Sequence, residues 1–163
     1  MLSSTARFGQ EQTFVAAEIE HGNAGKASMS QTIIVETFGP PIPNLKNSDL
    51  CEVTFSSLVL RALIQLSAND DDEDRFLEIV FEGPKGFRYL DEGDLLPYWR
   101  SKAFDNSSHL VHEVKRGGWA EQEEQSGMLN VTAAIGSHRE WIVVSSNGCL
   151  SVIATTEPLI RFF

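Results

Sequence analysis

The side chains best suited to metal binding are the four histidines, His21, His109, His112 and His138. Two of them lie in the segment His109-Leu-Val-His112-Glu113, which matches neither the HExxH zinc motif nor its inverted form. Residues three apart in a strand point to opposite faces, so these imidazoles could share a metal only on a helix, and no third ligand is evident. We therefore expect no metal site.

The densest cluster of possible cation ligands is the acidic run NDDDED at residues 69–74. Its alternating aspartates are similar to the beginning of an EF-hand calcium loop. However, Arg75 stands where that loop requires a glycine, and Phe81 stands where it requires a bidentate acid. This pattern excludes calcium binding of the EF-hand type and favours a solvated loop between two strands.

Motifs for covalent catalysis and nucleotide binding are missing from the chain. There is no GxSxG nucleophile elbow, no P-loop and no GxGxxG run. The two cysteines, Cys51 and Cys149, have no histidine or lysine as sequence neighbours and lie in apolar runs, where a thiol usually packs as a small hydrophobe. We expect reduced, buried thiols and no cofactor, and these absences favour a protein that is not an enzyme.

The remaining candidate site is the segment FRYLDEGDLLPYW at residues 87–99, where carboxylates lie between two pairs of aromatic rings. Such a combination can bind a cation or form the centre of an interface with a basic protein. The predicted binding surface consists of Tyr89, Asp91, Glu92, Asp94, Tyr98 and Trp99. In the structural alternative, Phe87, Leu95 and Trp99 pack a short helix against the sheet while the acids face water.

The charge of the chain restricts its partners. Its formal net charge is −10 and its sequence pI is about 4.8. Phosphate backbones should repel such a chain, so we expect no nucleic-acid partner, whereas a basic protein is a compatible one. No apolar run approaches the 18 or so residues of a membrane-spanning helix. The composition favours no particular oligomeric state.

Residues 1–28 differ from the rest in their patchy periodicity and in the loop-like stretch HGNAGKAS at 21–28. They are either an extension upstream of an original start at Met29 or a segment with a short strand around residues 13–19. Residues 29–163 then form a single globular domain. The N-terminal stretch lacks the apolar core of a secretory signal, so we expect a cytoplasmic protein.

Alternating apolar and polar residues predict strands at 31–38, 75–83 and 109–116. The run at 51–68 fits a helix as well as a strand that slips at Ser56-Ser57. A strand is favoured because the acidic run and the strand that follows complete the layout of a hairpin. We also predict a short helix capped by Asp94, and either a helical turn or an exposed loop at 119–127.

The C-terminal segment EWIVVSSNGCLSVIATTEP predicts a β-hairpin with Asn147 and Gly148 at its tip, because Asn-Gly is favoured where a type I′ turn needs two positive φ angles. This register pairs Ser146 with Cys149 and Val143 with Val152. Both faces of the hairpin are apolar, so it should lie within the sheet and be covered on both sides.

These elements predict an α+β, β-rich domain with a mostly antiparallel, bent sheet and one or two short helices. In size, charge and β-rich layout the chain is similar to small acidic bacterial proteins that act by binding, such as immunity proteins against secreted toxins. This resemblance rests on no motif and transfers no functional residue. We expect a non-catalytic protein-binding function; the alternative is a small-molecule binder or enzyme with a pocket in a curved sheet.

Overall fold

The computed structural model describes residues 32–43, 45–66, 75–104 and 107–163, apart from the side chains of Glu92, Leu95 and Pro97. The two interpretations of residues 1–28 and the acidic run at 69–74 therefore lie outside the described residues. Within the described ranges the chain forms nine strands, three α-helices and two 3₁₀ turns.

The strands are β1 (Ile34–Phe38), β2 (Ser48–Ser56), β3 (Val59–Leu66), β4 (Arg75–Glu82), β5 (Gly86–Leu90), β6 (Val111–Arg116), β7 (Arg139–Ser145), β8 (Gly148–Ala154) and β9 (Leu159–Phe162). The helices are α1 (Leu96–Arg100), α2 (Trp119–Ser126) and α3 (Asn130–Ile135), and the 3₁₀ turns are η1 (Leu45–Asn47) and η2 (Glu92–Leu95). The strands predicted at 31–38, 75–83 and 109–116 correspond to β1, β4 and β6, and residues 119–127 form α2.

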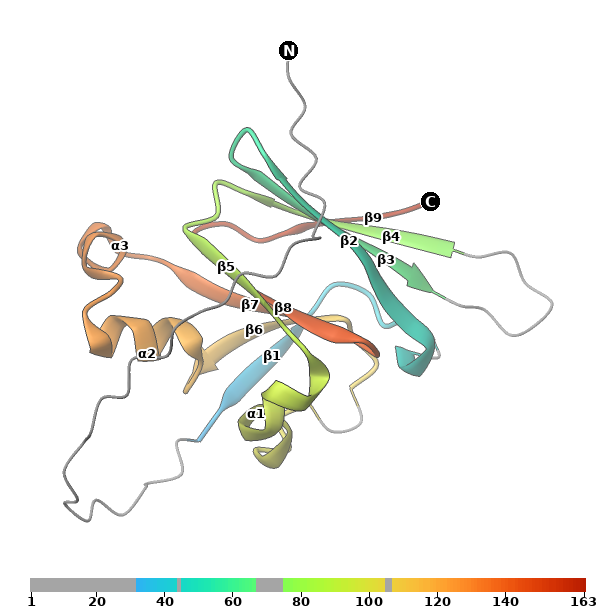
Figure 1. Ribbon diagram of the computed structural model, residues 1–163, viewed down its shortest axis with the longest axis horizontal. Coiled ribbons are helices and arrows are strands. Elements are labelled where there is room, and N and C mark those ends of the chain that lie inside the picture. The colour runs from blue at the N-terminus through green and yellow to red at the C-terminus, as the bar shows by residue number, and fades with distance from the viewer. Residues whose placement is uncertain (1–31, 44, 67–74, 105–106) are drawn as a thin grey trace, which may run out of the picture. The chain divides into compact units, whose positions relative to one another are not determined.

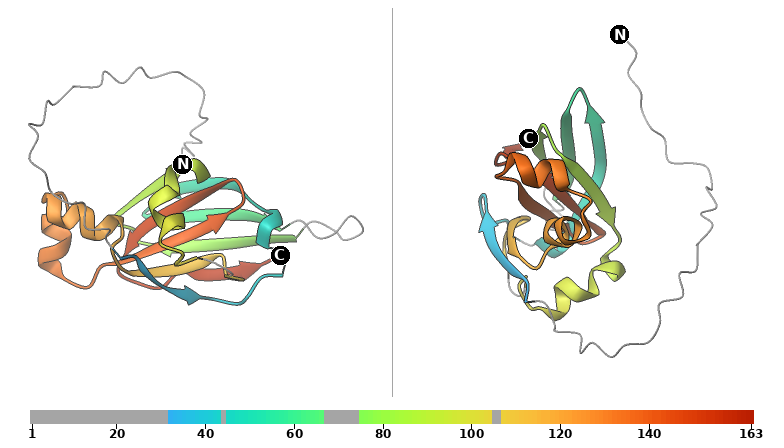
Figure 2. Two further views of the ribbon diagram at one scale, coloured as in Figure 1. Left: turned by 90° about the horizontal axis from the view of Figure 1, so that it is seen from below. Right: turned by 90° about the vertical axis from the view of Figure 1, so that its left-hand side faces the viewer.

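The strands form two antiparallel sheets that pack face to face (Figures 1 and 2). One sheet has five strands in the order β1-β6-β7-β8-β5, and the other has four in the order β2-β3-β4-β9. The α+β, β-rich, antiparallel fold class is confirmed. In detail, the strands divide between two sheets, and three short helices are present.

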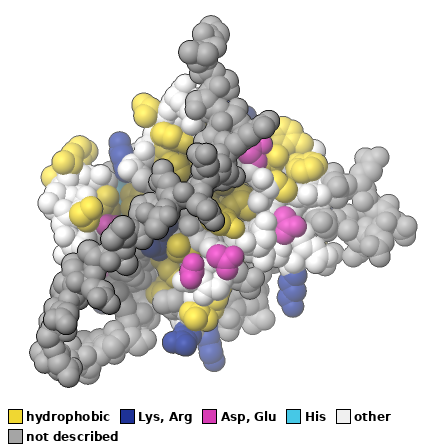
Figure 3. All heavy atoms as spheres, in the orientation of Figure 1, with side chains coloured by type: hydrophobic (Ala, Val, Ile, Leu, Met, Phe, Trp, Pro, Cys, Tyr) yellow, Lys and Arg dark blue, Asp and Glu magenta, His cyan; other side chains and the backbone are white. Residues whose placement is uncertain are grey.

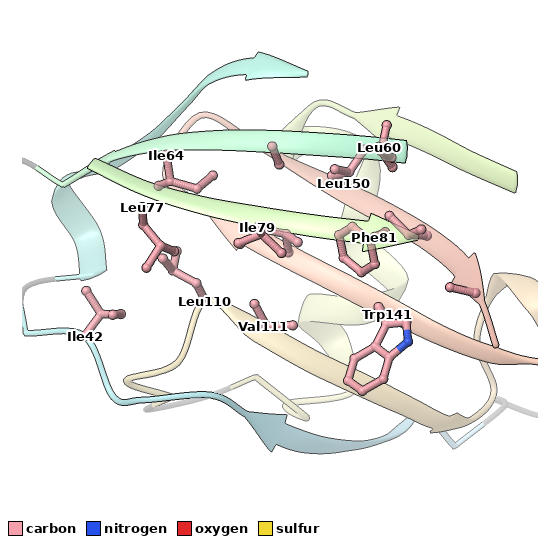
Figure 4. Packing of buried hydrophobic residues seen from close by; sticks show 14 residues of the cluster. Ile42, Leu60, Ile64, Leu77, Ile79, Phe81, Leu110, Val111, Trp141 and Leu150 are labelled. Carbon is pink, nitrogen blue, oxygen red and sulfur yellow. The ribbon is translucent and has the colours of Figure 1, made fainter. Parts of the chain in front are cut away.

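The main core lies between the two sheets and follows from the alternation along the strands. The four-stranded sheet contributes inward-facing side chains from β3 and β4, and the five-stranded sheet contributes them mainly from β6, β7 and β8 (Figure 4). These buried residues include Leu60, Ile64, Leu77, Ile79, Phe81, Val111, Trp141, Val143, Leu150 and Val152. On the outward face of the four-stranded sheet, Glu78 forms ion pairs with Arg61 and Arg161, so this face is polar and solvated.

The five-stranded sheet is covered on its second face by α1 and the segment that follows it. Ile142 and Cys149 point to this side and pack with Tyr98 and Phe104 in a second apolar cluster. The predicted two-sided burial of the C-terminal hairpin is therefore confirmed, because β7 and β8 lie between the main core and this cluster. Figure 2 shows α2 and α3 beyond one end of the strands.

The C-terminal hairpin is present, but its predicted register is wrong. Ser145 pairs with Gly148 and Val143 with Leu150, which leaves Ser146 and Asn147 at the tip. Neither Asn147 nor Gly148 has a positive φ. Contacts with β2 favour this register: the Ser146 amide donates to the Ser48 carbonyl (2.7 Å), and the Leu50 amide donates to Oδ1 of Asn147 (2.9 Å).

The ambiguous segment at 51–68 is strand, as predicted, but the slip at Ser56-Ser57 is in fact a chain reversal. Ser57 and Leu58 have φ angles of 52° and 63° and form the two-residue turn between β2 and β3. Two consecutive positive φ angles are what a tight hairpin of this twist requires, although neither residue is a glycine or asparagine. The β3–β4 pairing confirms the hairpin that was expected around the acidic run.

Two local predictions need correction. Asp91, and not Asp94, caps the turn before α1, because Asp91 Oδ1 accepts the Gly93 amide at 2.9 Å at the beginning of η2. Cys51 is exposed on β2, and Cys149 is buried on β8 as expected. Cys51 lies at an irregularity in the β2–β3 register between Leu50 and Glu52, which takes its side chain out of the regular alternation.

Candidate functional site

The residues of the predicted binding surface separate into an exposed group and a buried one. Tyr89, Asp91 and Asp94 are exposed, and the Glu92 side chain lies outside the described atoms. Trp99 is half-buried, with its ring edge-on to Phe104 at 5.6 Å. Tyr98 is 4% exposed, so this ring cannot take part in a surface contact.

Tyr98 belongs to a buried polar cluster that sequence reasoning did not find. Its hydroxyl donates to Oε1 of Glu140 at 3.2 Å and accepts from Nη2 of Arg88 at 3.3 Å. The Arg88 guanidinium also lies over the Trp119 ring, 4.7 Å from its centroid. Burial, together with the adjacent Glu140 carboxylate, raises the pKa of Tyr98, so its hydroxyl stays protonated.

Glu140 holds the beginning of α2 against the five-stranded sheet. Its Oε2 accepts the backbone amide of Ala120 at 2.8 Å, in place of a capping side chain on Gly118. A Cβ at Gly118 would lie 2.2 Å from this oxygen, so a glycine is needed for the carboxylate to approach. Burial raises the pKa of Glu140, while the amide hydrogen bonds oppose that shift. We interpret this cluster as structural, because Tyr98 and Glu140 are 4% and 3% exposed and both carboxylate oxygens of Glu140 have partners within the protein.

Another charged network connects β1, β6 and β7 with the segment before β9. The Glu113 carboxylate accepts from Nε (2.7 Å) and Nη2 of Arg139 and pairs with Lys115. Arg139 reaches Glu157 with Nη1 at 3.2 Å, and Lys115 reaches Glu36 at 3.1 Å. Every charge in this network has a partner, so it fastens strands together and leaves no charge for a ligand.

The candidate functional site is the side of the sandwich where the edge strands β2 and β5 meet. Phe55 of β2 and Phe87 of β5 are in ring contact at 5.5 Å, yet they are 47% and 40% exposed. Tyr89, next on the same face of β5, is 52% exposed. We call Phe55, Phe87 and Tyr89 the aromatic edge.

The aromatic edge consists of side chains that point inward. Phe55 lies opposite Leu60 in the β2–β3 register, and Phe87 lies opposite Val152 in the β5–β8 register. Both opposite residues are fully buried core residues. Directly opposed residues in antiparallel strands share a face, so the two rings face the core but lie beyond its covered part. They are therefore apolar surface that the described part of the chain does not bury.

One end of the aromatic edge is fixed by the C-terminal hairpin. Tyr89 donates its hydroxyl to the Asn147 carbonyl at 3.0 Å, and its ring covers Gly148, where a Cβ would lie 2.3 Å from the hydroxyl oxygen. The Asn147 side-chain amide accepts from and donates to the backbone of Leu50 (2.9 and 3.3 Å). This amide connects β2 to the hairpin tip, so the aromatic edge has a rigid support.

Exposed carboxylates lie on the two strands of the aromatic edge or directly after them. Asp91 and Asp94 are exposed directly after β5, and Asp49 is exposed on β2. Glu52 is also exposed on β2, but it accepts from Thr54, which pairs with the outward-facing Arg61, so it lies on the other face of β2 from Phe55. Figure 3 shows exposed hydrophobic and acidic side chains close to one another on the face that includes β5 and α1. The predicted combination of aromatic and acidic residues is therefore present for Tyr89, Asp91 and Asp94, with Phe55 and Phe87 as ring partners instead of Tyr98.

Sequence reasoning missed Phe55 and left Phe87 open, as part of the aromatic and acidic segment or, in the structural alternative, as a contact between a helix and the sheet. In the structure Phe87 contacts Phe55 of the opposite sheet. Alternation gives the face of a strand on which a ring lies, but whether the ring is covered depends on the order of strands in each sheet. No signal in the local sequence carries that order.

The described residues contain no group of three or more histidine, cysteine or acidic side chains that could hold a metal ion. Among the described helices, none has the length and apolarity needed to cross a membrane. Comparison of the chain with protein-family models, curated proteins and solved structures finds no match.

Proposed function

We propose that this protein is a non-catalytic binding protein whose aromatic edge docks a basic segment of a partner protein. The observation that carries the proposal is the exposure of Phe55, Phe87 and Tyr89, three rings on core-facing positions that the fold leaves in contact with solvent. Aromatic side chains on a rigid support are the residues that contribute most to binding energy at protein interfaces.

The apolar part of the interaction would supply the affinity. Burial of apolar surface contributes about 25 cal/mol per Å², and a large aromatic side chain buries about 150–250 Å² when fully covered. The three rings are already partly covered, so each would gain a fraction of that area. Leu58, at the β2–β3 turn three residues after Phe55, is 68% exposed and would extend the apolar contact.

The charge around the aromatic edge favours a basic partner. Asp91 and Asp94 follow β5 directly, Asp49 and Glu52 are exposed on β2, and the whole chain has a formal net charge of −10. Exposed charges attract an oppositely charged partner over distances that salt screens beyond about 8 Å at physiological ionic strength. They should therefore raise the association rate more than they slow dissociation.

The test is affinity capture from the cells that express the protein, with two matched double variants. Phe55→Ser with Phe87→Ser removes the two rings in mutual contact, whereas Ile34→Ser with Leu159→Ser removes exposed apolar residues from edge strands on the opposite side. We expect the wild type and the Ile34/Leu159 variant to retain one shared basic partner and the Phe55/Phe87 variant to lose it. Equal retention by both variants would contradict the proposal.

Association kinetics then test the part played by the carboxylates. Neutralising Asp91 and Asp94 to asparagine should slow association with the captured partner and flatten its salt dependence, while the dissociation rate changes less. The matched control is Glu124→Gln, which removes an exposed charge on α2. Equal association rates of the wild type and the Asp91/Asp94 variant would remove electrostatic steering from the proposal.

A further inference from the structure

A cleft of about 410 Å³ lies between η1 and the segment that leads into β6. Its described lining is Ile42, Leu45, Lys46, Asn47, Ser107 and Ser108. The two walls are connected where the Ile42 amide donates to the Ser108 carbonyl at 2.6 Å. The small-molecule alternative considered from the sequence placed tyrosines, a tryptophan or histidines in a pocket, but the described lining of this cleft has none of these.

A buried histidine lies directly behind one of the cleft residues. His112 is 1% exposed, and its Nε2 is 2.8 Å from Oγ of Ser107. The imidazole ring of His112 packs nearly perpendicular to the ring of Phe104, with 5.1 Å between the centroids. Nδ1 of His112 has no hydrogen-bond partner among the described atoms. Burial and the nearby His109 lower the pKa of His112 to about 4, so at neutral pH the ring is uncharged and carries one N–H.

The position of that single proton follows from what each nitrogen contacts. A buried N–H without an acceptor costs about 1–3 kcal/mol and is rarer in proteins than an acceptor without a donor. If Nδ1 carried the proton, a donor would be buried against apolar groups. The proton is therefore on Nε2, which donates to Ser107 Oγ.

This tautomer determines whether the Ser107 hydroxyl acts as a hydrogen-bond donor or as an acceptor toward a ligand in the cleft. Its Oγ accepts from His112 Nε2 at 2.8 Å and from the backbone amide of His109 at 3.1 Å. A hydroxyl oxygen has two lone pairs, so both are occupied and the hydroxyl can act only as a donor. The acceptor that the described residues provide for this proton, the His109 carbonyl, is 3.5 Å away, at the limit of a hydrogen bond. The Ser107 hydroxyl is thus a poorly used donor at the cleft surface.

The rest of the described lining indicates the charge and shape of the ligand that this cleft would fit. Lys46 is the one charged residue of that lining, and no described carboxylate forms an ion pair with it. Asn47 adds a side-chain amide, while the half-buried Leu45 and the 5%-exposed Ile42 supply a small apolar area. One cation, one hydroxyl donor and a small apolar area are complementary to a single negative charge on a short apolar group.

We propose that this cleft binds a small monocarboxylate with a short apolar tail, whose carboxylate accepts from the Ser107 hydroxyl and pairs with Lys46. The tail lies against Leu45. This site goes beyond the protein-binding function, because none of its residues belongs to the aromatic edge.

The first test is titration with sodium hexanoate, monitored by backbone amide NMR. We expect saturable shifts of the Asn47, Ser107 and Ser108 amides, at ionic strength held constant with sodium chloride. Hexan-1-ol, which has the same tail without the charge, should give no saturable shift of these amides. Equal responses to the two compounds, or no saturable response to hexanoate, would overturn the proposal.

Variants separate the two donors. Lys46→Gln should weaken hexanoate binding about tenfold, because a hydrogen bond to a charged group is worth about this much or more. Lys85→Gln, which removes an exposed lysine from the β4–β5 turn, should leave binding unchanged. Ser107→Ala should also weaken binding. Equal affinities for the wild type and Lys46→Gln would contradict the assignment of the charge partner.

A final measurement needs no ligand and remains informative if Ser107→Ala fails to fold. Long-range ¹⁵N–¹H correlation of the His112 ring in the wild-type protein reports which nitrogen carries the proton. We expect the Nε2–H tautomer at pH 7. The Nδ1–H tautomer would mean that the Ser107 hydroxyl donates its proton to Nε2 of His112. The cleft would then have no hydroxyl donor, and the proposed mode of binding would be overturned.

Discussion

The two lateral sides of the sandwich, at β1 and β9 and at β2 and β5, use aromatic residues in opposite ways. On the side of β1 and β9, Phe38 packs edge-on against Trp141 at 5.0 Å, and Trp141 is fully buried. Phe38 also joins a group of apolar residues from both sheets that leaves no space for a water molecule. On the side of β2 and β5, Phe55 and Phe87 contact each other but remain exposed. One side completes the core, and the other leaves core-facing rings available.

The chain path explains this difference. After β1 the chain turns at Gly39, with φ at +79°, so closely to the opposite sheet that a Cβ there would lie 2.4 Å from Cδ1 of Ile160. Residues 40–43 then carry Ile42 into the gap between the sheets, where it is 5% exposed. No comparable segment among the described residues covers Phe55 and Phe87. The closed side is therefore expected to contribute to stability and the open side to binding.

The largest expected effect is the loss of Phe38 from the closed side. Phe38→Ala should destabilise the fold by about 2–3 kcal/mol, because it removes a ring from the face of Trp141 and leaves a cavity between the sheets. Chemical denaturation measures the change. A loss no larger than that of Phe87→Ala would mean that the two sides do not differ in the way proposed.

The ionic network on the closed side should give a pH-dependent effect of about 2 kcal/mol. Hydrogen bonds from Arg139 hold the pKa of Glu113 below its ordinary value. A lowered pKa in the folded state means that the stabilisation is present above the ordinary carboxylate pKa and is lost as pH falls through the folded value. Glu113→Gln should therefore be less stable than the wild type at pH 7 by about 2 kcal/mol.

The pH dependence of this difference is the sharper observation. It should shrink as the pH falls below the ordinary carboxylate range, because the wild-type Glu113 then also loses its charge. Glu157→Gln, at the exposed end of the same network, should change stability by less than about 1 kcal/mol. A Glu113→Gln difference that stays constant down to acid pH would show that its origin is not ionic.

At the open side, Gly148→Val should destabilise the fold by about 1–2 kcal/mol, because the new side chain displaces the Tyr89 ring. Gly148 does not have the positive φ that the sequence pattern predicted, so the expected cost is steric. Adding Tyr89→Ala should recover part of the loss, since the two residues are in contact. Strict additivity of the two changes in denaturation experiments would exclude this steric explanation.

The smallest expected effect on stability comes from the aromatic edge itself. Phe87→Ala should cost less than about 1 kcal/mol, because the ring is already 40% exposed and its contact with Phe55 is at the surface. Thermal and chemical denaturation both measure this change. A loss of about 3 kcal/mol would place Phe87 in the core and remove the basis for a binding role.

Features that repeat along a strand could be predicted from the sequence. The alternation of Leu77, Ile79 and Phe81 with acidic residues predicted β4, and two apolar faces correctly predicted a hairpin that is covered on both sides. Both inferences depend on the period of a strand, which is a local property.

Features set by contacts between distant segments could not be predicted. The Asn-Gly rule placed the hairpin tip one residue too late, because the Asn147 amide pairs with the backbone of Leu50, 97 residues away in the chain. Likewise, Glu140 caps a helix that begins some twenty residues earlier. The candidate site depends on the meeting of β2 and β5 from different sheets, and nothing in the local pattern around Phe55 indicates it.

Site-specific photo-crosslinking tests the central claim most directly. A photo-reactive phenylalanine analogue is placed at Phe87 on the open side or, as a matched control, at Ile34, which is 45% exposed on the edge strand β1. After irradiation of the cells that express the protein, mass spectrometry identifies the adducts. We predict one basic protein attached at position 87 and absent at position 34. The absence of a protein adduct at position 87, or the same adducts at both positions, would contradict the account.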